Sequence, residues 1–350
     1  MAMESFSGIV VRSTGSWYDV LHEGVQYQCR IRGKLRLKGV RSTNPVVVGD
    51  VVQVEADEQG GYVISAIEPR RNYIIRRASN LSKESHIIAA NLDQALLVVT
   101  LFSPETATEF IDRFLVTCEA YKVPVTILLA KIDLARQSPE AVEEFHSIYE
   151  SAGYRIIEVS ATEGEGVDQV RELLRGKTTL LSGNSGVGKS TLVAAIEEGL
   201  DIRTGEISQS HHKGKHTTTF STMYPLSEGG YIIDTPGIKG FGLLDIEDAE
   251  LAHYFPEMMR FLPECRFYNC SHTHEPHCAV VEAVQRGEIA YPRYESYLKI
   301  LDEDFLLCIL PPFYSQLFVR PPQTAILLFL LFHGDGLDPC LLYNVTNFIS

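Results

Sequence analysis

The sequence predicts a multidomain α/β protein. A small antiparallel β-barrel is followed by a doubly wound α/β domain with a mostly parallel sheet, and then by a mainly helical segment. Three observations predict this order: short β-type runs fill residues 6–72, buried strands alternate with helices from residue 93, and three of the seven cysteines lie within residues 265–278. At 350 residues and 45% hydrophobic content, the chain is long enough for two or three domains.

The first module, residues 1–72, is predicted to be a barrel because Gly, Asn and Asp turns separate its β-type runs. The expected strands are Gly8–Arg12, Tyr18–Leu21, Tyr27–Ile31, Val46–Val54 and Tyr62–Ile67. After Tyr27, basic residues recur at every second position, so an extended strand would place five cations on one face. These are Arg30, Arg32, Lys34, Arg36 and Lys38, with Arg41 just beyond. We expect this face to contact an RNA backbone; a solvated basic hairpin is the alternative.

Charge is distributed unevenly along the chain. Residues 1–77 carry 11 Lys and Arg against 8 Asp and Glu, whereas the remainder carries 20 against 37. The formal net charge of −14 therefore excludes a protein that binds nucleic acid over its whole surface. No signal peptide opens the sequence, and the longest apolar run, "AILLFLLF" from Ala325, is far shorter than the roughly 18 residues of a membrane span. We expect a cytoplasmic monomer without a transmembrane helix.

The second module, residues 73–248, alternates strands with helices. The apolar segments "DQALLVVT", "VTILLA", "YRIIEVS", "TTLLSG" and "GGYIIDTPG" are predicted strands. One apolar stripe predicts a helix between the first two, formed by Phe110, Ile111, Phe114, Leu115, Cys118 and Tyr121. Further helices are expected over Val167–Leu174 and from the glycine-rich loop to Glu198. This alternation is typical of a doubly wound parallel sheet.

The glycine-rich loop follows the strand "TTLLSG" and precedes a helix. It matches G-x-x-x-x-G-K-[ST] over Gly183, Asn184, Ser185, Gly186, Val187, Gly188, Lys189 and Ser190, with Thr191 next. Its backbone amides would cradle phosphates, Lys189 would reach the β and γ oxygens, and Ser190 would ligate Mg²⁺. Downstream, "YIIDTPG" would place Asp234 to hold Mg²⁺ through water and the Gly237 amide to face the γ-phosphate.

The candidate base-reading motif precedes the phosphate loop. Lys131 and Asp133 lie in "LLAKIDL", at the end of an expected strand. The Asp133 carboxylate would accept hydrogen bonds from guanine N1 and N2, which adenine cannot donate, while the Lys131 stem would cover the ring. Ser160 and Ala161 of "EVSAT" would complete the base pocket. The sequence therefore predicts a GTP-binding domain whose motifs are in circularly permuted order.

A Cys/His cluster marks the third module, residues 249–304. Cys265, Cys270, His272 and Cys278 offer three thiolates and one imidazole, a full tetrahedral set for one structural Zn²⁺. Buried free cysteines in a helical domain are the alternative. The odd cysteine count, seven, favours a metal site in a reducing compartment over a disulfide framework.

Together these motifs resemble the ribosome small-subunit-dependent GTPase A family, bacterial factors that act on the small ribosomal subunit. The resemblance covers residues 1 to about 303 and rests on "IAANLDQ", "KIDL", "GNSGVGKS", "KGKHTTTF", "IIDTPGIKGFGL" and "CRFYNCSHTHEPHC". It implies an N-terminal OB-fold, a permuted GTPase domain and a C-terminal zinc domain. It also implies that the small subunit stimulates GTP hydrolysis and that hydrolysis is coupled to late maturation of the subunit, with rRNA and other assembly factors as partners.

The segment "HHKGKHTTTF" is the expected switch between the phosphate loop and Asp234. One of Thr217, Thr218 and Thr219 would offer its hydroxyl to Mg²⁺, and the resemblance favours Thr218. The resemblance also implies that His216 positions the attacking water, and Lys189 of the phosphate loop completes the predicted catalytic set. Ile238 occupies the place where Ras-type enzymes keep a water-orienting Gln. Because an apolar side chain cannot orient water, we expect slow intrinsic hydrolysis.

Two features depart from the family. Ala130 replaces the Asn that begins the family's base motif, which should weaken nucleotide binding by ~1–3 kcal/mol without removing the discrimination by Asp133. Residues 305–350 continue with little charge and no clear period, and we interpret them as a non-family tail that is disordered or frame-shifted. Two other functions stay open: an RNA-binding scaffold that holds GTP with little turnover, and a nucleotide-dependent regulator without a ribosomal partner.

Overall fold

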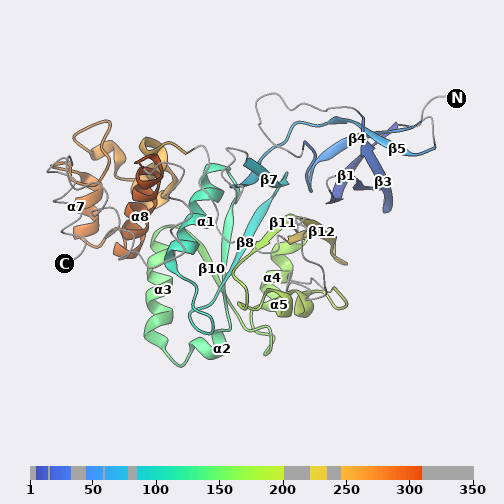
Figure 1. The fold of residues 1–350 in the computed structure, drawn as a ribbon. Coiled ribbons are helices and arrows are strands. Elements are labelled where there is room, and N and C mark those ends of the chain that lie inside the picture. Colours follow the sequence, from blue (N-terminus) through green and yellow to red (C-terminus); the bar gives the residue numbers. More distant parts are fainter. Residues whose placement is uncertain are drawn as a thin grey trace, which may run out of the picture. The chain divides into compact units, whose positions relative to one another are not determined.

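The computed structural model describes residues 5–14, 16–32, 45–57, 60–77, 85–200, 221–234 and 246–309. The chain divides into one unit, Met1–Ile300, and a second unit, Leu301–Ser350, of which residues 301–309 are described. The first unit contains the barrel, the α/β domain and the helical segment with the Cys/His cluster (Figure 1).

Five strands close the N-terminal barrel. They are β1 (Ser5–Ser13), β2 (Tyr18–His22), β3 (Val25–Ile31), β4 (Val51–Ala56) and β5 (Tyr62–Ile67). β1 pairs with β2 and β4, β2 pairs with β3, and β5 pairs with β3 and β4, so the ring of strands is complete. Alternate side chains point inward, and Val10, Val20, Val52 and Ile64 are fully buried in the barrel core.

The expected strand Val46–Val54 begins later than predicted because the chain turns at Gly49 and Asp50. Gly49 has a φ of 89°, and a Cβ there would lie 2.1 Å from the Ala90 carbonyl oxygen. The buried Asp50 carboxylate accepts hydrogen bonds from the Arg70 guanidinium at 2.6 and 2.7 Å. Such a turn interrupts an extended strand, so β4 starts at Val51.

A two-stranded antiparallel sheet follows the barrel. It consists of β6 (Tyr73–Arg77) and β7 (Ser85–Ala90), and an isolated bridge joins Val48 of the barrel to Ala89 of β7. This close approach explains why only glycine fits at position 49.

The α/β domain has a sheet in the order β10-β9-β8-β11-β13-β12. Its strands are β8 (Gln94–Val99), β9 (Val125–Ala130), β10 (Arg155–Val159), β11 (Thr178–Ser182), β12 (Thr222–Pro225) and β13 (Tyr231–Asp234). Its helices are α1 (Thr108–Ala120), α2 (Ile132–Ala135), α3 (Pro139–Ser151), α4 (Val167–Leu174) and α5 (Lys189–Ile196). The pairs are parallel except β12, which is antiparallel to β13 and to β1.

Apolar clusters cover both faces of this sheet, which explains why its strands are continuously apolar. In β8, Leu97 and Val99 belong to one cluster, whereas Leu96 and Val98 belong to the other. Helix α1 adds its predicted apolar stripe to the first cluster, and α4 and α5 pack in the second. Because the strands are parallel, the loops at their carboxyl ends meet at one edge of the sheet.

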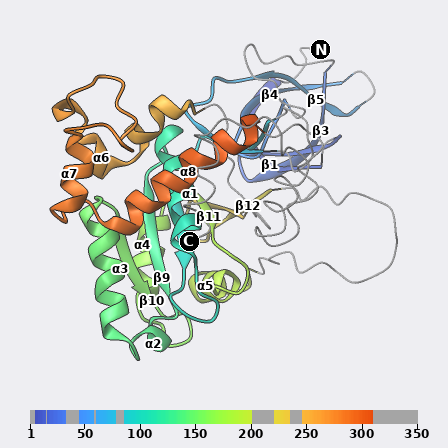
Figure 2. The same cartoon turned by 60° about the vertical axis from the view of Figure 1, so that its left-hand side comes forward.

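The C-terminal part is made of short helices and one longer helix. They are η1 (Asp248–Tyr254), α6 (Pro256–Met259), η2 (Leu262–Glu264), α7 (Ala279–Gln285) and α8 (Tyr291–Ile309). Figure 2 shows α8 beside the loops that hold the Cys/His cluster between η2 and α7. Helix α8 continues past residue 304, the expected end of this module. Among the described helices, none has the length and apolar character needed to cross a bilayer.

Candidate nucleotide site and metal centre

The glycine-rich loop joins β11 to α5, as predicted. Gly183 directly follows β11 with a φ of 146°, and a Cβ there would lie 2.3 Å from the Val98 carbonyl oxygen. Gly188 is the left-handed N-cap residue of α5. The loop therefore passes tightly over the end of β8 and leads to the N-terminus of α5, whose first amides have no partner within the helix. Such amides favour an anion such as a phosphate.

Lys189 and Asp234 provide the charges beside this loop. Lys189 is only 9% exposed, and its Nζ donates to the carbonyl oxygens of Gly183 at 2.5 Å and Asn184 at 2.8 Å. Burial lowers the pKa of Lys189, and the nearby Asp234 carboxylate opposes that shift. Asp234 ends β13 in register with Leu181 of β11, at the same edge of the sheet. The ammonium therefore already lies inside the loop, where phosphate oxygens would replace the carbonyls as acceptors.

A cavity of about 230 Å³ connects the base motif with the phosphate loop. Lys131 and Asp133 line it together with Gly188 and Thr191. The other lining residues are Ala130, Leu134, Val159, Ala161, Thr162, Val187 and Leu192. Two motifs that are far apart in the sequence thus meet at one cavity, an arrangement that a single bound nucleotide can bridge.

Lys131 holds the two motifs together. It adopts a left-handed conformation with a φ of 56° at the N-cap of α2. Its Nζ donates to the carbonyl oxygens of Ser103 at 2.5 Å and Gly186 at 2.8 Å. Ala130, which is 6% exposed, adds only a methyl group to the cavity wall. In this chain the side-chain link between base loop and phosphate loop is therefore made by Lys131.

Ser160 and Ala161 have different positions in the loop after β10. Ala161 lines the cavity, whereas Ser160 is fully buried and its hydroxyl accepts a hydrogen bond from the Glu163 amide at 3.3 Å. Ser160 therefore shapes the loop. Sequence reasoning missed four lining residues, because an apolar or neutral wall carries no motif: Leu134, Val159, Thr162 and Leu192. Their proximity to the motif residues was the only available signal.

Four metal-ligand side chains meet in the C-terminal part. The ligand atoms of Cys265, Cys270, His272 and Cys278 all lie within 4.8 Å of one another. His272 Nδ1 is 3.4 Å from Cys278 Sγ and 3.6 Å from Cys265 Sγ, and these two sulfurs are 4.0 Å apart. Ligands at about 2.3 Å (sulfur) and about 2.0 Å (nitrogen) from a tetrahedral Zn²⁺ have separations of this size. The four residues therefore fit one metal ion.

The chemistry of these side chains also fits a cation. All three cysteines are free thiols. Burial raises the pKa of Cys270 to about 12 and lowers the pKa of His272. The lowered pKa of His272 favours its neutral imidazole, which is the form that binds a metal. A divalent cation would stabilise the cysteine thiolates, which burial disfavours.

The family models match most of the described chain. The RsgA GTPase model matches residues 67–244, and the RsgA N-terminal domain model matches residues 7–64. The chain belongs to the RsgA GTPase family. The GTPase domain and the N-terminal barrel that the sequence predicts are thereby confirmed, and the likeness to a solved circularly permuted GTPase confirms the permuted order.

Curated relatives and solved structures agree with this membership. The small ribosomal subunit biogenesis GTPase RsgA of Bacteroides fragilis is 54% identical over 298 residues, which cover 85% of this chain and 96% of the relative. The RsgA of Porphyromonas gingivalis is 55% identical over 304 residues, again 85% and 96% of the two chains. The crystal structure of YjeQ from Thermotoga maritima has a TM-score of 0.69 and 37% identity, covering 86% of this chain and 98% of that one. YloQ, a circularly permuted GTPase, has a TM-score of 0.65 and 27% identity, covering 86% and 95%.

Part of the predicted site lies outside the described residues. This applies to the switch residues His216 and Thr218 and to Gly237. It also applies to four of the six cations of the predicted RNA-binding face, Lys34, Arg36, Lys38 and Arg41. The roles given to these residues stay predictions. Ser190, by contrast, lies in the first turn of α5, next to Lys189.

The other two cations of that face, Arg30 and Arg32, are exposed on the barrel. The Arg30 guanidinium lies 4.1 Å from the centroid of the Trp17 ring. Arg32 donates to the Glu55 carboxylate at 2.6 Å. Because an exposed ion pair is weak, Arg32 can exchange Glu55 for a phosphate at small cost.

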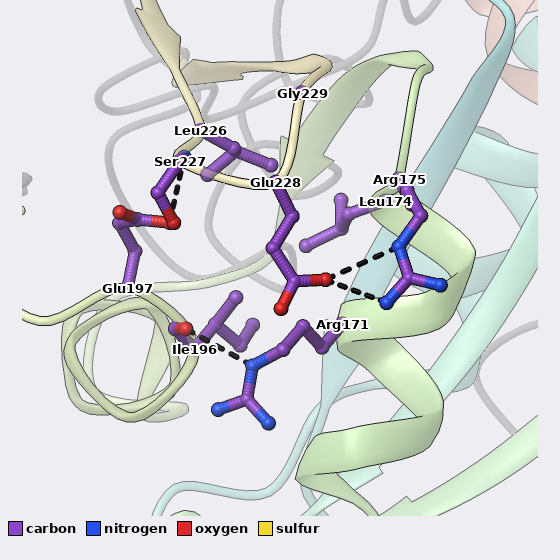
Figure 3. A pocket seen from close by; sticks show the side chains of 9 residues that line it. All are labelled: Arg171, Leu174, Arg175, Ile196, Glu197, Leu226, Ser227, Glu228 and Gly229. Carbon is purple, nitrogen blue, oxygen red and sulfur yellow. Dashed lines mark hydrogen bonds and ion pairs between the residues drawn. The ribbon is translucent and has the colours of Figure 1, made fainter.

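A second cavity, of about 40 Å³, lies beside α4 and α5 (Figure 3). Its polar side chains form hydrogen bonds with other groups of this chain. Arg171 donates to the carbonyl oxygens of Ala195 and Ile196, Arg175 donates to Glu228, and Glu197 accepts from Ser227. These contacts fix the C-terminus of α5 and the β12–β13 turn, so this cavity is structural.

Proposed function

We propose that this member of the RsgA GTPase family binds GTP in the 230 Å³ cavity, binds the small ribosomal subunit and couples GTP hydrolysis to late maturation of that subunit. The observation that carries the proposal is the meeting of Lys131 and Asp133 with the phosphate loop in a circularly permuted domain. The relatives that are 54% and 55% identical are named as small ribosomal subunit biogenesis GTPases, which supports the choice of partner.

The residues at the cavity supply selection and charge stabilisation. Asp133 accepts hydrogen bonds from guanine, so GTP is preferred over ATP. The amides at the start of α5 and the Lys189 ammonium neutralise the β and γ oxygens as the γ-phosphoryl group is transferred to water. Ser190, Asp234 and Thr218 are the residues that would hold Mg²⁺, which would neutralise charge on the same oxygens. His216 positions the attacking water; inorganic phosphate and GDP are the products.

The barrel and the Cys/His domain would form the ribosome-facing surface. Arg30 and Arg32 on the barrel can contact rRNA phosphates, and Cys265, Cys270, His272 and Cys278 would hold one structural Zn²⁺. Because ribosomal subunits mature in the bacterial cytoplasm, we place the activity there. Contacts with other assembly factors belong to the same proposal, as does action as a monomer.

Phosphate release tests the proposed function. Purified chain is mixed with excess GTP, and inorganic phosphate is followed over many turnovers with and without small subunits. We expect slow release alone, because Ile238 cannot orient water, and at least tenfold faster release with small subunits. Equal rates with and without subunits, measured on protein that binds GTP, would overturn the coupling to the ribosome. His216→Ala should abolish the stimulation while leaving GTP binding intact.

One observation favours a second candidate, an RNA-binding scaffold that holds GTP with little turnover. Ala130 gives the cavity an apolar wall where the family has an Asn, which lowers the expected affinity for nucleotide. The same assay separates the candidates: a scaffold would release no more than one phosphate per chain, even with saturating subunits, and would still sediment with them.

A further inference from the structure

A fully buried arginine joins the C-terminal part to the α/β domain. Arg293 on α8 has no exposed surface, and its Nη1 donates to Asp112 Oδ1 of α1 at 2.6 Å. Its Nε and Nη2 donate to the Glu257 carboxylate of α6 at 2.6 and 3.2 Å. Asp112 is also fully buried, and Glu257 is 2% exposed. We call these three residues the Arg293 cluster.

The surroundings of the Arg293 cluster exclude water. The guanidinium lies 4.8 Å from the ring centroid of Phe255, 5.6 Å from that of Tyr154 and 5.8 Å from that of Tyr149. Separating opposite charges in such a place leaves an uncompensated buried ion, which is strongly unfavourable. Helices α1 and α8 therefore keep one relative position as long as the cluster is intact.

The same turn of α8 also holds the loop of residues 265–278, which carries the Cys/His cluster and which we call the Cys/His loop. The Tyr294 hydroxyl donates to the His272 carbonyl oxygen at 2.7 Å, and the Tyr297 hydroxyl donates to the Ser271 carbonyl oxygen at 2.7 Å. Both tyrosines are buried, at 8% and 1% exposure. A shift of α8 would thus move the backbone of a candidate metal ligand.

Asp112 lies near the N-terminus of α1, and this helix begins where a tight loop packs on the phosphate loop. In this loop, residues 100–107, the Thr100 hydroxyl donates to the Pro104 carbonyl oxygen at 2.5 Å. The Ser103 carbonyl oxygen accepts the Lys131 ammonium, which also binds Gly186. Pro104 Cδ lies 3.3 Å from the position that a Cβ on Gly186 would take. A movement of the phosphate loop or of Lys131 therefore also moves the loop that leads into α1.

We propose that the Arg293 cluster couples the nucleotide cavity to the Cys/His loop, so that nucleotide binding and the folded state of that loop stabilise each other. The physical connection runs from the cavity through Lys131 and loop 100–107 to α1, across Asp112–Arg293 to α8, and through Tyr294 and Tyr297 to the loop. Coupling of this kind is reciprocal: an effect of nucleotide on the loop requires an equal effect of the loop on nucleotide affinity. The proposal rests on the proposed nucleotide site, but not on hydrolysis or on the ribosome.

The test measures both directions in the full chain, with GDP as the nucleotide. Hydrogen–deuterium exchange follows the amides of residues 266–278 with and without saturating GDP. Titration in excess Mg²⁺ gives the GDP dissociation constant before and after chelation, with a chelator that binds Zn²⁺ far more tightly than Mg²⁺, so that only the metal of the Cys/His cluster is removed. We expect GDP to slow exchange at these amides at least threefold, and chelation to weaken GDP binding at least fivefold. The decisive variant is Asp112→Leu, which removes the bond to α1 and leaves a one-to-one Arg293–Glu257 pair.

In Asp112→Leu, GDP should change the exchange rates of these amides by no more than about 1.5-fold, and chelation should change the GDP dissociation constant by no more than about 1.5-fold. The matched control Arg286→Met should keep both effects. Arg286 lies in the same domain, but its ion pair with Glu288 is exposed. If Asp112→Leu is unfolded by circular dichroism, Asp112→Asn takes its place and should lose at least half of each effect. Full coupling in a folded Asp112 variant, or GDP binding in the unaltered chain without any protection of residues 266–278, would overturn the proposal. Absence of GDP binding to the unaltered chain would instead contradict the proposed function itself.

Discussion

At the scale of single residues, we propose that Asp133 decides which base the cavity accepts. It lines the cavity with Lys131 and Gly188, so its carboxylate is available to a bound base. We expect Asp133→Asn to lower the preference for GTP over ATP by about 3 kcal/mol, roughly 100-fold, because the variant amide repels one of the two guanine donors. Competition of GTP and ATP against a fluorescent GDP measures the ratio. Glu140→Gln, an exposed change at the start of α3, is the control, and an unchanged ratio in Asp133→Asn would show that the base binds elsewhere.

We propose that Ala130 affects the strength of nucleotide binding rather than its selectivity. Its methyl group lies in the same wall as Val159 and Val187, where an amide side chain would find the base and the phosphate loop within reach. We expect Ala130→Asn to tighten GDP binding by ~1–3 kcal/mol with little change in the GTP-to-ATP ratio. Calorimetric titration of both proteins checks this. Weaker binding in the variant would contradict this expectation and would mean that the added amide only crowds a cavity whose loops Lys131 already links.

At the scale of elements, a carboxylate organises the Cys/His loop. Glu275 Oε1 accepts from the Ser271 hydroxyl and amide, each at 2.7 Å, and Oε2 accepts from the Thr273 amide at 3.2 Å. Burial alone would raise the pKa of Glu275, but these hydrogen bonds lower it to about 2. The ionised carboxylate is therefore the form that holds the loop in shape.

This shift predicts how stability depends on pH. The folded pKa of Glu275, about 2, is below its ordinary value of 4.5, so its contribution is complete above pH 4.5 and is lost as the pH falls towards 2. We expect Glu275→Gln to be less stable than the unaltered chain at pH 6 and the difference to shrink by more than half at pH 3. Urea denaturation at both values measures it, and metal loss at low pH affects both proteins alike. A difference that is constant with pH would contradict the assignment.

At the scale of the whole molecule, two ion pairs of the barrel have opposite roles. Arg70 and Asp50 are 8% and 0% exposed, and they fix the turn by which the barrel meets β7. Arg32 and Glu55 are 49% and 28% exposed, on the face that we expect to contact RNA. Burial thus assigns the first pair to stability and leaves the second free to change partners.

We expect Arg70→Met to lower the free energy of unfolding of the barrel by about 3–5 kcal/mol, because it leaves the Asp50 charge unpaired. Arg32→Met should lower the free energy of unfolding by at most ~1 kcal/mol. It should nevertheless weaken binding to small subunits, and the affinity should depend less steeply on salt concentration, by the amount that one phosphate contact contributes. The chain has a single tryptophan, Trp17 in the barrel, so its fluorescence reports barrel unfolding in the full chain. Equal stability losses in the two variants would refute this division of roles.

The sequence by itself determined the order of the modules, the five parallel strands and three of the helices of the α/β domain, the phosphate loop and the four Cys/His residues that meet in the C-terminal part. These follow from the spacing of apolar residues and from motifs of neighbouring residues, and both depend on only a few consecutive positions of the chain. The sequence did not predict α2, α3 or β12. Only the tertiary structure decided that β4 starts at Val51, that Lys131 binds Ser103 and Gly186, and that Arg293 joins Asp112, a residue 181 positions away. Such contacts depend on which surfaces pack together, and the free energy of a buried charge depends on that packing rather than on the local sequence.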